Sequence, residues 1–286
     1  MKLIRFGELG AEKPGVHIDG INYDVSAFVK EYDELFFASG GIAQLEWMLS
    51  NKANTLPIVP ASTRLGCPVA RPSKVLCVGL NYAKHAKETN AAIPTEPILF
   101  MKSTTAVVGP NDAIMIPRDS LKTDWEVELA VVISKKASYV TEENAMDYVA
   151  GYCLHNDVSE RAFQLERGGT WDKGKGCDTF APIGPWMVTK DEIANPHALR
   201  LWLSLNGKIV QDSNTDDLIF NIPQLISYIS CFMTLLPGDI ISTGTPAGVG
   251  LGMNPPVYLK PGDVIELGID GLGVSQQNII AYQPEA

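Results

Sequence analysis

The chain has 286 residues, of which 45% are hydrophobic, and a formal net charge of −10 at pH 7. This length and apolar content are sufficient for one large globular domain or two smaller ones. The negative charge argues against a nucleic-acid partner or an anionic membrane surface, because both attract lysine and arginine.

The negative charge leaves a small molecule as the expected partner, and the N-terminal sequence indicates a cytoplasmic protein. Arg5 and Gly7 stand where a secretory signal needs an apolar run, and no stretch approaches the roughly 20 apolar residues of a membrane span. The five cysteines are scattered and lack Cys-x-x-Cys spacing, so neither a disulfide framework nor a zinc site is favoured.

Residues 1–60 predict a small N-terminal α+β module. We expect short strands over residues 2–6 and 15–25, and a helix over residues 42–49. Within the second stretch, Asp19-Gly20 has the composition of a positive-φ hairpin turn.

The composition of the sequence changes after this module. Residues 61–72 contain two prolines, two more lie just before them, and the stretch shows little periodicity, which predicts an extended linker. Residues 73–286 are then expected to form the larger domain, which opens with an apolar strand over residues 74–79.

A predicted helix over residues 82–88 carries a candidate acid–base pair. His85 and Glu88 are three residues apart, so they share a face on which the carboxylate could orient the imidazole and raise its basicity. An exposed charge pair explains the same spacing. Lys102, which ends the next predicted strand, is either an ordinary strand-end lysine or a binder of an anionic substrate.

The chain's most informative stretch is the predicted strand over residues 124–133. Glu126 and Glu128 would project from the same face of a strand, where they repel each other unless a cation compensates them. A second predicted strand, residues 148–154, leads to Asp157, which completes a carboxylate triad if the two strands are neighbours. Three oxygen ligands suit Mg²⁺, Mn²⁺ or Ca²⁺. A solvated edge-strand face is the alternative for an isolated Glu-x-Glu.

The region after Asp157 adds polar and glycine-rich elements. Arg161 and Gln164 are spaced to share a helical face. The glycine-rich residues 168–176 form either a flexible loop or a backbone that approaches a ligand closely, and they lack the ending of a phosphate loop.

The C-terminal third completes the fold prediction. Residues 201–211 form the clearest hairpin, and a helix is expected from Asn221 to about Thr234. In the loop over residues 244–250, backbone amides and the Thr245 hydroxyl could hold a carboxylate, although a structural turn also explains it. The many short strands predict an α+β fold of layered mixed β-sheets.

Four motifs follow one another along the larger domain. They are Val78-Gly79-Leu80-Asn81-Tyr82-Ala83-x-His85, Glu126-x-Glu128 with Gly151-Tyr152 and Asn156-Asp157-Val158-Ser159-x-Arg161, Lys173-Gly174-Lys175-Gly176 with Asp178-Thr179-Phe180, and Ser242-Thr243-Gly244-Thr245-Pro246-Ala247-Gly248. In this order they resemble the motifs of the fumarylacetoacetate hydrolase family, and the resemblance covers roughly residues 73–280. The start of the chain is similar to the branch with 2,4-diketo-3-deoxy-sugar-acid hydrolases and proteins labelled ureidoglycolate lyases.

Taken with the residue patterns, the resemblance implies a layered family fold and a complete site. The expected metal is Mg²⁺ or Mn²⁺, with Ca²⁺ able to take its place in a crystal. The residues and roles are Glu126, Glu128 and Asp157 as metal ligands, His85 with Glu88 as the water-activating pair, Lys175 as the group that stabilises the enolate, and Arg161, Gln164, Thr245 and Lys102 as substrate contacts.

The implied reaction is metal-dependent hydrolysis of a carbon–carbon bond in a 2,4-diketo acid, either an acylpyruvate or a 2,4-diketo-3-deoxy sugar acid, to pyruvate and a second acid. A ureidoglycolate lyase, an oxaloacetate decarboxylase or a 2-oxo acid isomerase could use the same metal site. A non-enzymatic protein with a structural Ca²⁺ site is disfavoured, because such a cage needs neither His85 nor Lys175. The resemblance also implies a homodimer.

Overall fold

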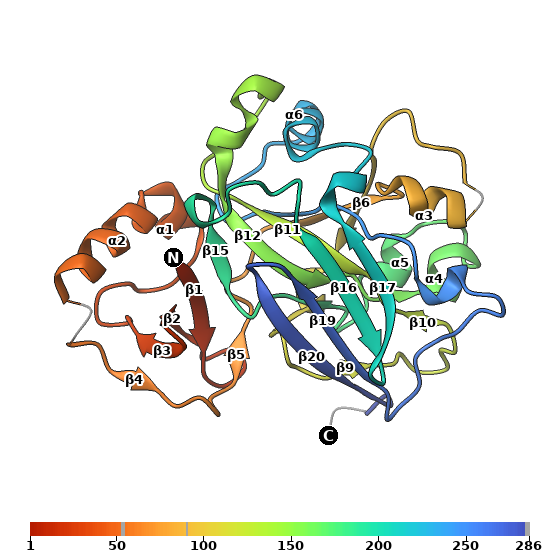
Figure 1. Cartoon of the computed structure of the whole chain (residues 1–286), viewed down its shortest axis with the longest axis horizontal. Coiled ribbons are helices and arrows are strands. Elements are labelled where there is room, and N and C mark those ends of the chain that lie inside the picture. Colours follow the sequence, from red (N-terminus) through yellow and green to blue (C-terminus); the bar gives the residue numbers. More distant parts are fainter. Residues whose placement is uncertain (53–54, 90, 284–286) are drawn as a thin grey trace.

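The computed structural model describes residues 1–52, 55–89 and 91–283, and most of its regular structure is β-sheet (Figure 1). The large sheet contains eleven strands. They are β1 (Lys2–Phe6), β2 (Lys13–Ile18), β3 (Ile21–Asp24), β4 (Ile58–Val59), β5 (Leu65–Gly66), β6 (Val75–Gly79), β7 (Ile98–Lys102), β11 (Val127–Ile133), β12 (Val149–Asn156), β15 (Met187–Thr189) and β18 (Ile240–Ser242).

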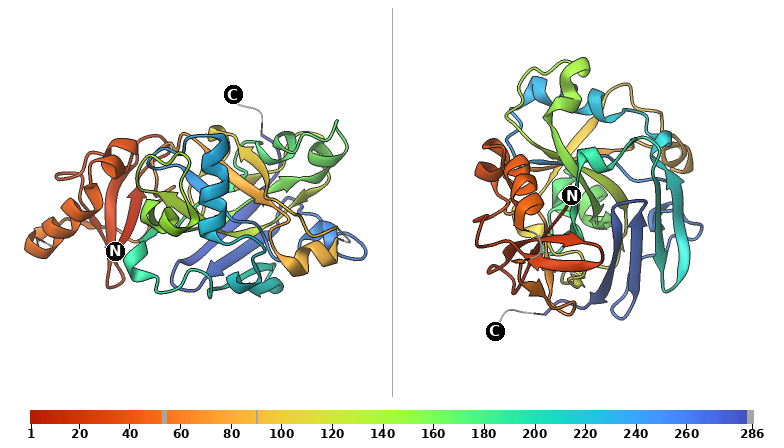
Figure 2. Two further views of the ribbon diagram at one scale, coloured as in Figure 1. Left: turned by 90° about the horizontal axis from the view of Figure 1, so that it is seen from above. Right: turned by 60° about the vertical axis from the view of Figure 1, so that its left-hand side comes forward.

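A second sheet of five strands lies across the large one, as both views of Figure 2 also show. It consists of β9 (Ile114–Met115), β16 (Arg200–Leu205), β17 (Lys208–Asn214), β19 (Val264–Ile269) and β20 (Gly273–Ile280). Two further strand pairs are formed by β8 (Val107–Val108) with β14 (Ala181–Pro182) and by β10 (Thr123–Asp124) with β13 (Ser159–Glu160). Parallel and antiparallel pairs both occur, which confirms the predicted layered mixed sheets.

The helices lie at the margins of the sheets. They are α1 (Glu34–Ala38), α2 (Gly41–Lys52), α3 (Ala83–Glu88), α4 (Arg161–Leu165), α5 (Asp172–Lys175) and α6 (Ile222–Phe232). Helix α6 follows Asn221, where the sequence predicts its start, and the structure adds a capping box between Asn221 and Gln224. Helices α3, α4 and α5 gather at one end of the molecule, at the right of Figure 1. No helix among the described residues is long and apolar enough to cross a membrane.

Strand β11 is the centre of the structure because both of its faces are buried. Val127, Leu129, Val131 and Ile133 point into the core shared with the five-stranded sheet. The alternate residues, Ala130 and Val132, pack in a second core with the N-terminal elements. Burial on both faces explains why the strand reads as a continuous apolar run.

The N-terminal strands extend the large sheet, because β1 pairs with β15. The expected hairpin turn is present, with positive φ at Asp19 (48°) and Gly20 (82°). The segment predicted as a linker, residues 61–72, includes β5, which pairs with β1. In the same segment, Arg64 forms ion pairs with Glu12 (2.9 Å) and Asp112 (2.6 Å). These pairs connect the segment to residues that precede it and to residues that follow it in the chain. The division into two domains at this segment stays a prediction.

One predicted strand is interrupted. Residues 124–133 do not form a single strand, since β10 ends at Asp124 and β11 begins at Val127. Asp124 pairs with Ser159 of β13, whereas Val127 pairs with Asn156 of β12. The chain therefore changes partner at residues 125–126, and Glu126 lies just outside β11.

Candidate active site

Three carboxylates converge where β11 begins and β12 ends. The antiparallel pairing of Val127 with Asn156 places Glu126 and Glu128 beside Asp157, which follows β12 directly. One oxygen atom from each of the three lies within 4.8 Å of the others, and all three residues are buried. The structure thus brings together the three predicted metal ligands, although Glu126 reaches the cluster from the break before the strand.

Two lysines bind the deepest carboxylate. Lys175 Nζ lies 2.8 Å from Asp157 Oδ2 and 2.7 Å from Glu126 Oε2. Lys102 Nζ lies 2.6 Å from Asp157 Oδ1 and donates to the carbonyl oxygen of Val158 at 2.8 Å. Burial alone would raise the pKa of Asp157, but the two ammonium groups outweigh it and hold this pKa below its ordinary value. Asp157 is therefore ionised.

Arg161 fixes the other side of Glu126. Its Nη2 lies 2.7 Å from Glu126 Oε1 and 2.8 Å from Asp124 Oδ2, and its Nη1 donates to Gln164 Oε1 at 3.0 Å. Burial would lower the pKa of Arg161, but the charges of Asp124 and Glu126 raise it above the usual value. The guanidinium stays charged and orients Glu126 in a fixed position.

Glu128 differs from its neighbours because no cation contacts it among the described residues. Its Oε2 accepts hydrogen bonds from Ser242 Oγ (2.5 Å) and the Gly244 amide (2.9 Å), which are neutral donors. Burial, together with the charges of Asp157 and Glu126, raises its pKa well above the ordinary value. A hard divalent cation would supply the missing charge, and an oxygen-only ligand set suits Mg²⁺ or Mn²⁺. The residues therefore fit such an ion.

The glycine-rich segment delivers Lys175 to this cluster. Its C-terminal part forms the short helix α5, which packs against α4. The close approach is to the protein's own backbone, and approach to a ligand stays a prediction. A Cβ on Gly174 would lie 2.4 Å from the carbonyl oxygen of Glu160 and 2.6 Å from the amide nitrogen of Gln164. Only glycine permits this contact, which brings the next side chain under Glu126 and Asp157.

His85 and Glu88 form the expected pair on α3. His85 Nδ1 lies 3.3 Å from Glu88 Oε2, and both residues are largely removed from solvent. The Glu88 carboxylate also accepts from the Gly248 amide at 3.0 Å, which fastens α3 to the loop after β18. With Nδ1 facing Glu88, Nε2 is the nitrogen that can take a proton.

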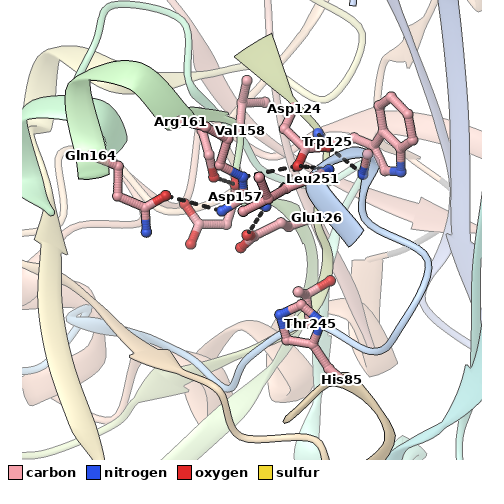
Figure 3. A network of polar contacts seen from close by, with 12 residues as sticks. His85, Asp124, Trp125, Glu126, Asp157, Val158, Arg161, Gln164, Thr245 and Leu251 are labelled. Carbon is pink, nitrogen blue, oxygen red and sulfur yellow. Dashed lines mark hydrogen bonds and ion pairs between the residues drawn. The ribbon is translucent and has the colours of Figure 1, made fainter. Parts of the chain in front are cut away.

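These groups border a cavity of about 200 Å³. Glu126, Glu128 and Lys175 line it, and so does His85. Figure 3 shows Glu126, Asp157 and Gln164 along one side, with His85 opposite them. A substrate in the cavity would therefore lie between the carboxylate cluster and the imidazole.

The predicted substrate contacts are distributed unevenly. Arg161, Gln164 and Thr245 line the cavity. The Thr245 hydroxyl donates to the carbonyl oxygen of Val127 (3.0 Å) and accepts from Gln211 (2.9 Å), so its proton is already engaged. Lys102 does not line the cavity, because it lies behind Asp157 and only 3% of it is exposed. This position favours a supporting role for Lys102.

Two residues of the site were not singled out from the sequence. Asp124 accepts from Arg161 and from the amides of Gly250 and Leu251. Ser242 bridges Glu128 and the buried His155, whose Nδ1 lies 2.6 Å from the serine oxygen. Asp124 lies two residues before Glu126 and Ser242 three residues before Thr245, but nothing in the local sequence indicates their distant partners.

Known proteins resemble the chain over its whole length. A Burkholderia multivorans protein named as a hydrolase, with no substrate in its name, is 52% identical over 279 residues, which cover 97% of this chain and 98% of that protein. The fumarylacetoacetate hydrolase of Exiguobacterium antarcticum has a TM-score of 0.87 at 37% identity, with coverage of 99% of this chain and 100% of that one.

Two other solved structures indicate the range of reactions among its neighbours. The maleylpyruvate hydrolase of Sphingobium sp. SYK-6, determined with manganese(II) and pyruvate, has a TM-score of 0.83 at 30% identity. The 2-hydroxyhepta-2,4-diene-1,7-dioate isomerase of Mycobacterium marinum has a TM-score of 0.76 at 31% identity. Each alignment covers 99% of this chain and 100% of the other.

The family model described as the fumarylacetoacetate (FAA) hydrolase C-terminal domain matches residues 74–280. This range contains all the carboxylates, lysines and the histidine of the site. The chain belongs to the fumarylacetoacetate hydrolase family.

Proposed function

We propose that the protein is a divalent-metal-dependent hydrolase that cleaves the C3–C4 bond of a 2,4-diketo acid to give pyruvate and a second acid. The observation that carries this proposal is the placement of Glu126, Glu128 and Asp157 on one side of a cavity whose other side holds His85. The hydrolases among its structural neighbours, one of them with manganese and pyruvate, support it.

Glu126, Glu128 and Asp157 would hold Mg²⁺ or Mn²⁺. When bound, such an ion would stabilise the negative charge that develops on the oxygens of a 2-oxo acid. This stabilisation is needed because the carbon that leaves carries the electron pair of the broken bond. The oxygen-only ligand set favours hard divalent ions over zinc or copper.

His85 acts as the general base. It takes a proton from water through Nε2, while Glu88 holds Nδ1 and stabilises the imidazolium that forms. The water oxygen adds to C4, and the C3–C4 bond then breaks with its electron pair moving toward C3 and the C2 oxygen. The protonated His85 can return its proton to C3, which completes pyruvate.

Lys175 is the electrophilic group contributed by the chain. Lys175 lines the cavity, its ammonium lies between Glu126 and Asp157, and both carboxylates raise its pKa against the lowering effect of burial. A permanently charged ammonium at this place stabilises the developing enolate. Arg161 holds Glu126 in position and does not need to contact the substrate.

The test is an assay of pyruvate release from a panel of acylpyruvates and 2,4-diketo-3-deoxy sugar acids, with lactate dehydrogenase and NADH as the indicator. Activity should require Mg²⁺ or Mn²⁺ and should be lost with a chelator. Release of urea from ureidoglycolate, with no pyruvate from any diketo acid, would replace the proposal by the lyase reaction.

An isomerase on the same site is the second candidate, favoured by the isomerase among the structural neighbours. It requires the same metal ligands and a base that moves a proton, but no attacking water. A change in ultraviolet absorbance of an unsaturated 2-hydroxy acid without pyruvate release would identify it.

A further inference from the structure

The walls of the cavity differ sharply from its carboxylate side. Beyond Glu126, Glu128 and Lys175, the lining is mostly apolar. The walls are formed by residues from several elements, namely Leu80, Phe100, Leu165, Trp171, Val249 and Leu251. A substrate whose 2-oxo acid end faces the carboxylate cluster must therefore place its other end against apolar side chains.

The aromatic part of this wall is built into the fold. The rings of Phe100 and Trp171 have centroids 5.4 Å apart, and Lys175 Nζ lies 4.9 Å from the centroid of Phe100. A Cβ on Gly79 would lie 2.4 Å from Trp171 Cζ3, so the end of β6 lacks a side chain where the indole packs. Trp171 consequently has a fixed place beside the site.

The cations that line the cavity are already paired. Among the described lining residues, only Arg161, Lys175 and His85 can carry positive charge. Arg161 contacts two carboxylates, Lys175 contacts two, and His85 faces Glu88. The described wall offers no free cation to a second carboxylate of a substrate.

One neutral donor remains open. Gln164 uses its Oε1 to accept from Arg161, and its Nε2 has no hydrogen-bond partner among the described residues. Figure 3 shows the side chain at the edge of the open space that His85 faces. A single amide donor suits a neutral carbonyl or hydroxyl oxygen.

From these observations we infer that the substrate carries one carboxylate only, at its 2-oxo acid end, and an uncharged acyl group beyond C4. This inference rests on the proposed function. A second carboxylate would lie against the apolar side chains of Phe100 and Trp171 without gaining a cation, and loss of hydration around an unpaired charge is costly in a protein site. The apolar walls act as the specificity filter.

The test compares two substrates of equal shape. Succinylpyruvate ends in a carboxylate, and 4-methylpentanoylpyruvate replaces that carboxylate by an isopropyl group. We expect kcat/KM, measured as pyruvate release with Mg²⁺, to be at least about 100-fold higher for the neutral compound than for succinylpyruvate. Equal values, or a preference for succinylpyruvate, would overturn the inference while leaving the hydrolase proposal intact.

A binding measurement keeps the inference testable if neither compound is cleaved, whereas the hydrolase proposal is judged on the whole panel of diketo acids. The pair is 5-methyl-2-oxohexanoate and 2-oxoglutarate, which differ by the same replacement, titrated calorimetrically with Mg²⁺ present. Tighter binding of the neutral acid supports the inference, and equal or tighter binding of 2-oxoglutarate contradicts it.

A variant with a new cation in the wall tests whether the acyl end of the substrate lies near Leu165. Leu165 is 49% exposed at the end of α4, so Leu165→Lys should fold normally. The lysine should improve kcat/KM for succinylpyruvate relative to the neutral compound by about tenfold. Leu165→Met, of similar length and uncharged, is the matched control and should leave the ratio unchanged. An unchanged ratio in Leu165→Lys would contradict the assignment of this wall as the source of the specificity.

Discussion

Replacement of Glu126 by glutamine tests metal binding separately from the stability of the fold. The amide keeps the size of the side chain but removes the charge of one of the three buried carboxylates. We expect the variant to fold, to bind Mg²⁺ or Mn²⁺ weakly and to have little activity. Replacement of a direct ligand should reduce metal affinity by more than the 10–100-fold that is typical for outer-shell partners.

The cost to folding should be moderate because each cation keeps another partner. Arg161 retains Asp124 at 2.8 Å, and Lys175 retains Asp157 at 2.8 Å. Hydrogen bonds to charged groups contribute about 1.5–3 kcal/mol each, and the glutamine oxygen can still accept one of the two. The free energy of unfolding should therefore fall by about 1–3 kcal/mol, less than the roughly 3–5 kcal/mol that follows when a buried charge loses its sole partner.

Calorimetric titration with Mg²⁺ and thermal unfolding with and without the ion measure both quantities. The ion should raise the Tm of the wild type, by an amount equivalent to about 2.7 kcal/mol at one hundred times its Kd, and should hardly change that of Glu126→Gln. Asp212→Asn is the matched control, because it removes the same charge from an exposed pair with Arg200. Undiminished Mg²⁺ binding by Glu126→Gln would refute the assigned ligand set.

Three further predictions concern the base, the helix that carries Lys175, and the assembly. His85→Ala should lower kcat by about 10²–10⁴-fold with KM and metal affinity nearly unchanged, and wild-type turnover would exclude the histidine as base. Gly174→Ala should shift α5, reduce turnover and cost about 1–3 kcal/mol of stability in denaturant unfolding, because the new Cβ overlaps Glu160; unaltered kinetics would contradict this. We also propose a homodimer on family membership, so light scattering should give twice the chain mass of 31.0 kDa, and a monomeric mass would contradict it.

Features set by neighbouring residues were predictable from the sequence. The turn at Asp19 and the cap at Asn221 depend on a few residues of local chemistry. Convergence of the carboxylates followed from one assumption, that the strand ending near Asp157 pairs with the strand after Glu126, and the structure confirms this pairing.

Features that depend on distant partners were not predictable. Glu126 lies in a break because Asp124 pairs with Ser159 while Val127 pairs with Asn156, and periodicity cannot reveal a change of partner. The same holds for the N-terminal strands, which join the large sheet through β15, more than 180 residues away. The sequence left Lys102 as either an ordinary strand-end lysine or a substrate contact, and only the fold places it beneath Asp157.

The balance of charge links the metal site to the specificity of the cavity. With Glu128 ionised, the four carboxylates Asp124, Glu126, Glu128 and Asp157 face three cations, so the cluster has one surplus negative charge. Glu128 is the carboxylate without a cation among the described residues. Ionic pairing of the other carboxylates keeps them in place before a metal arrives, which limits reorganisation during catalysis. With a divalent ion the cluster would have one surplus positive charge. That surplus matches the single carboxylate of a 2-oxo acid with a neutral acyl group, whereas a second carboxylate would remain uncompensated.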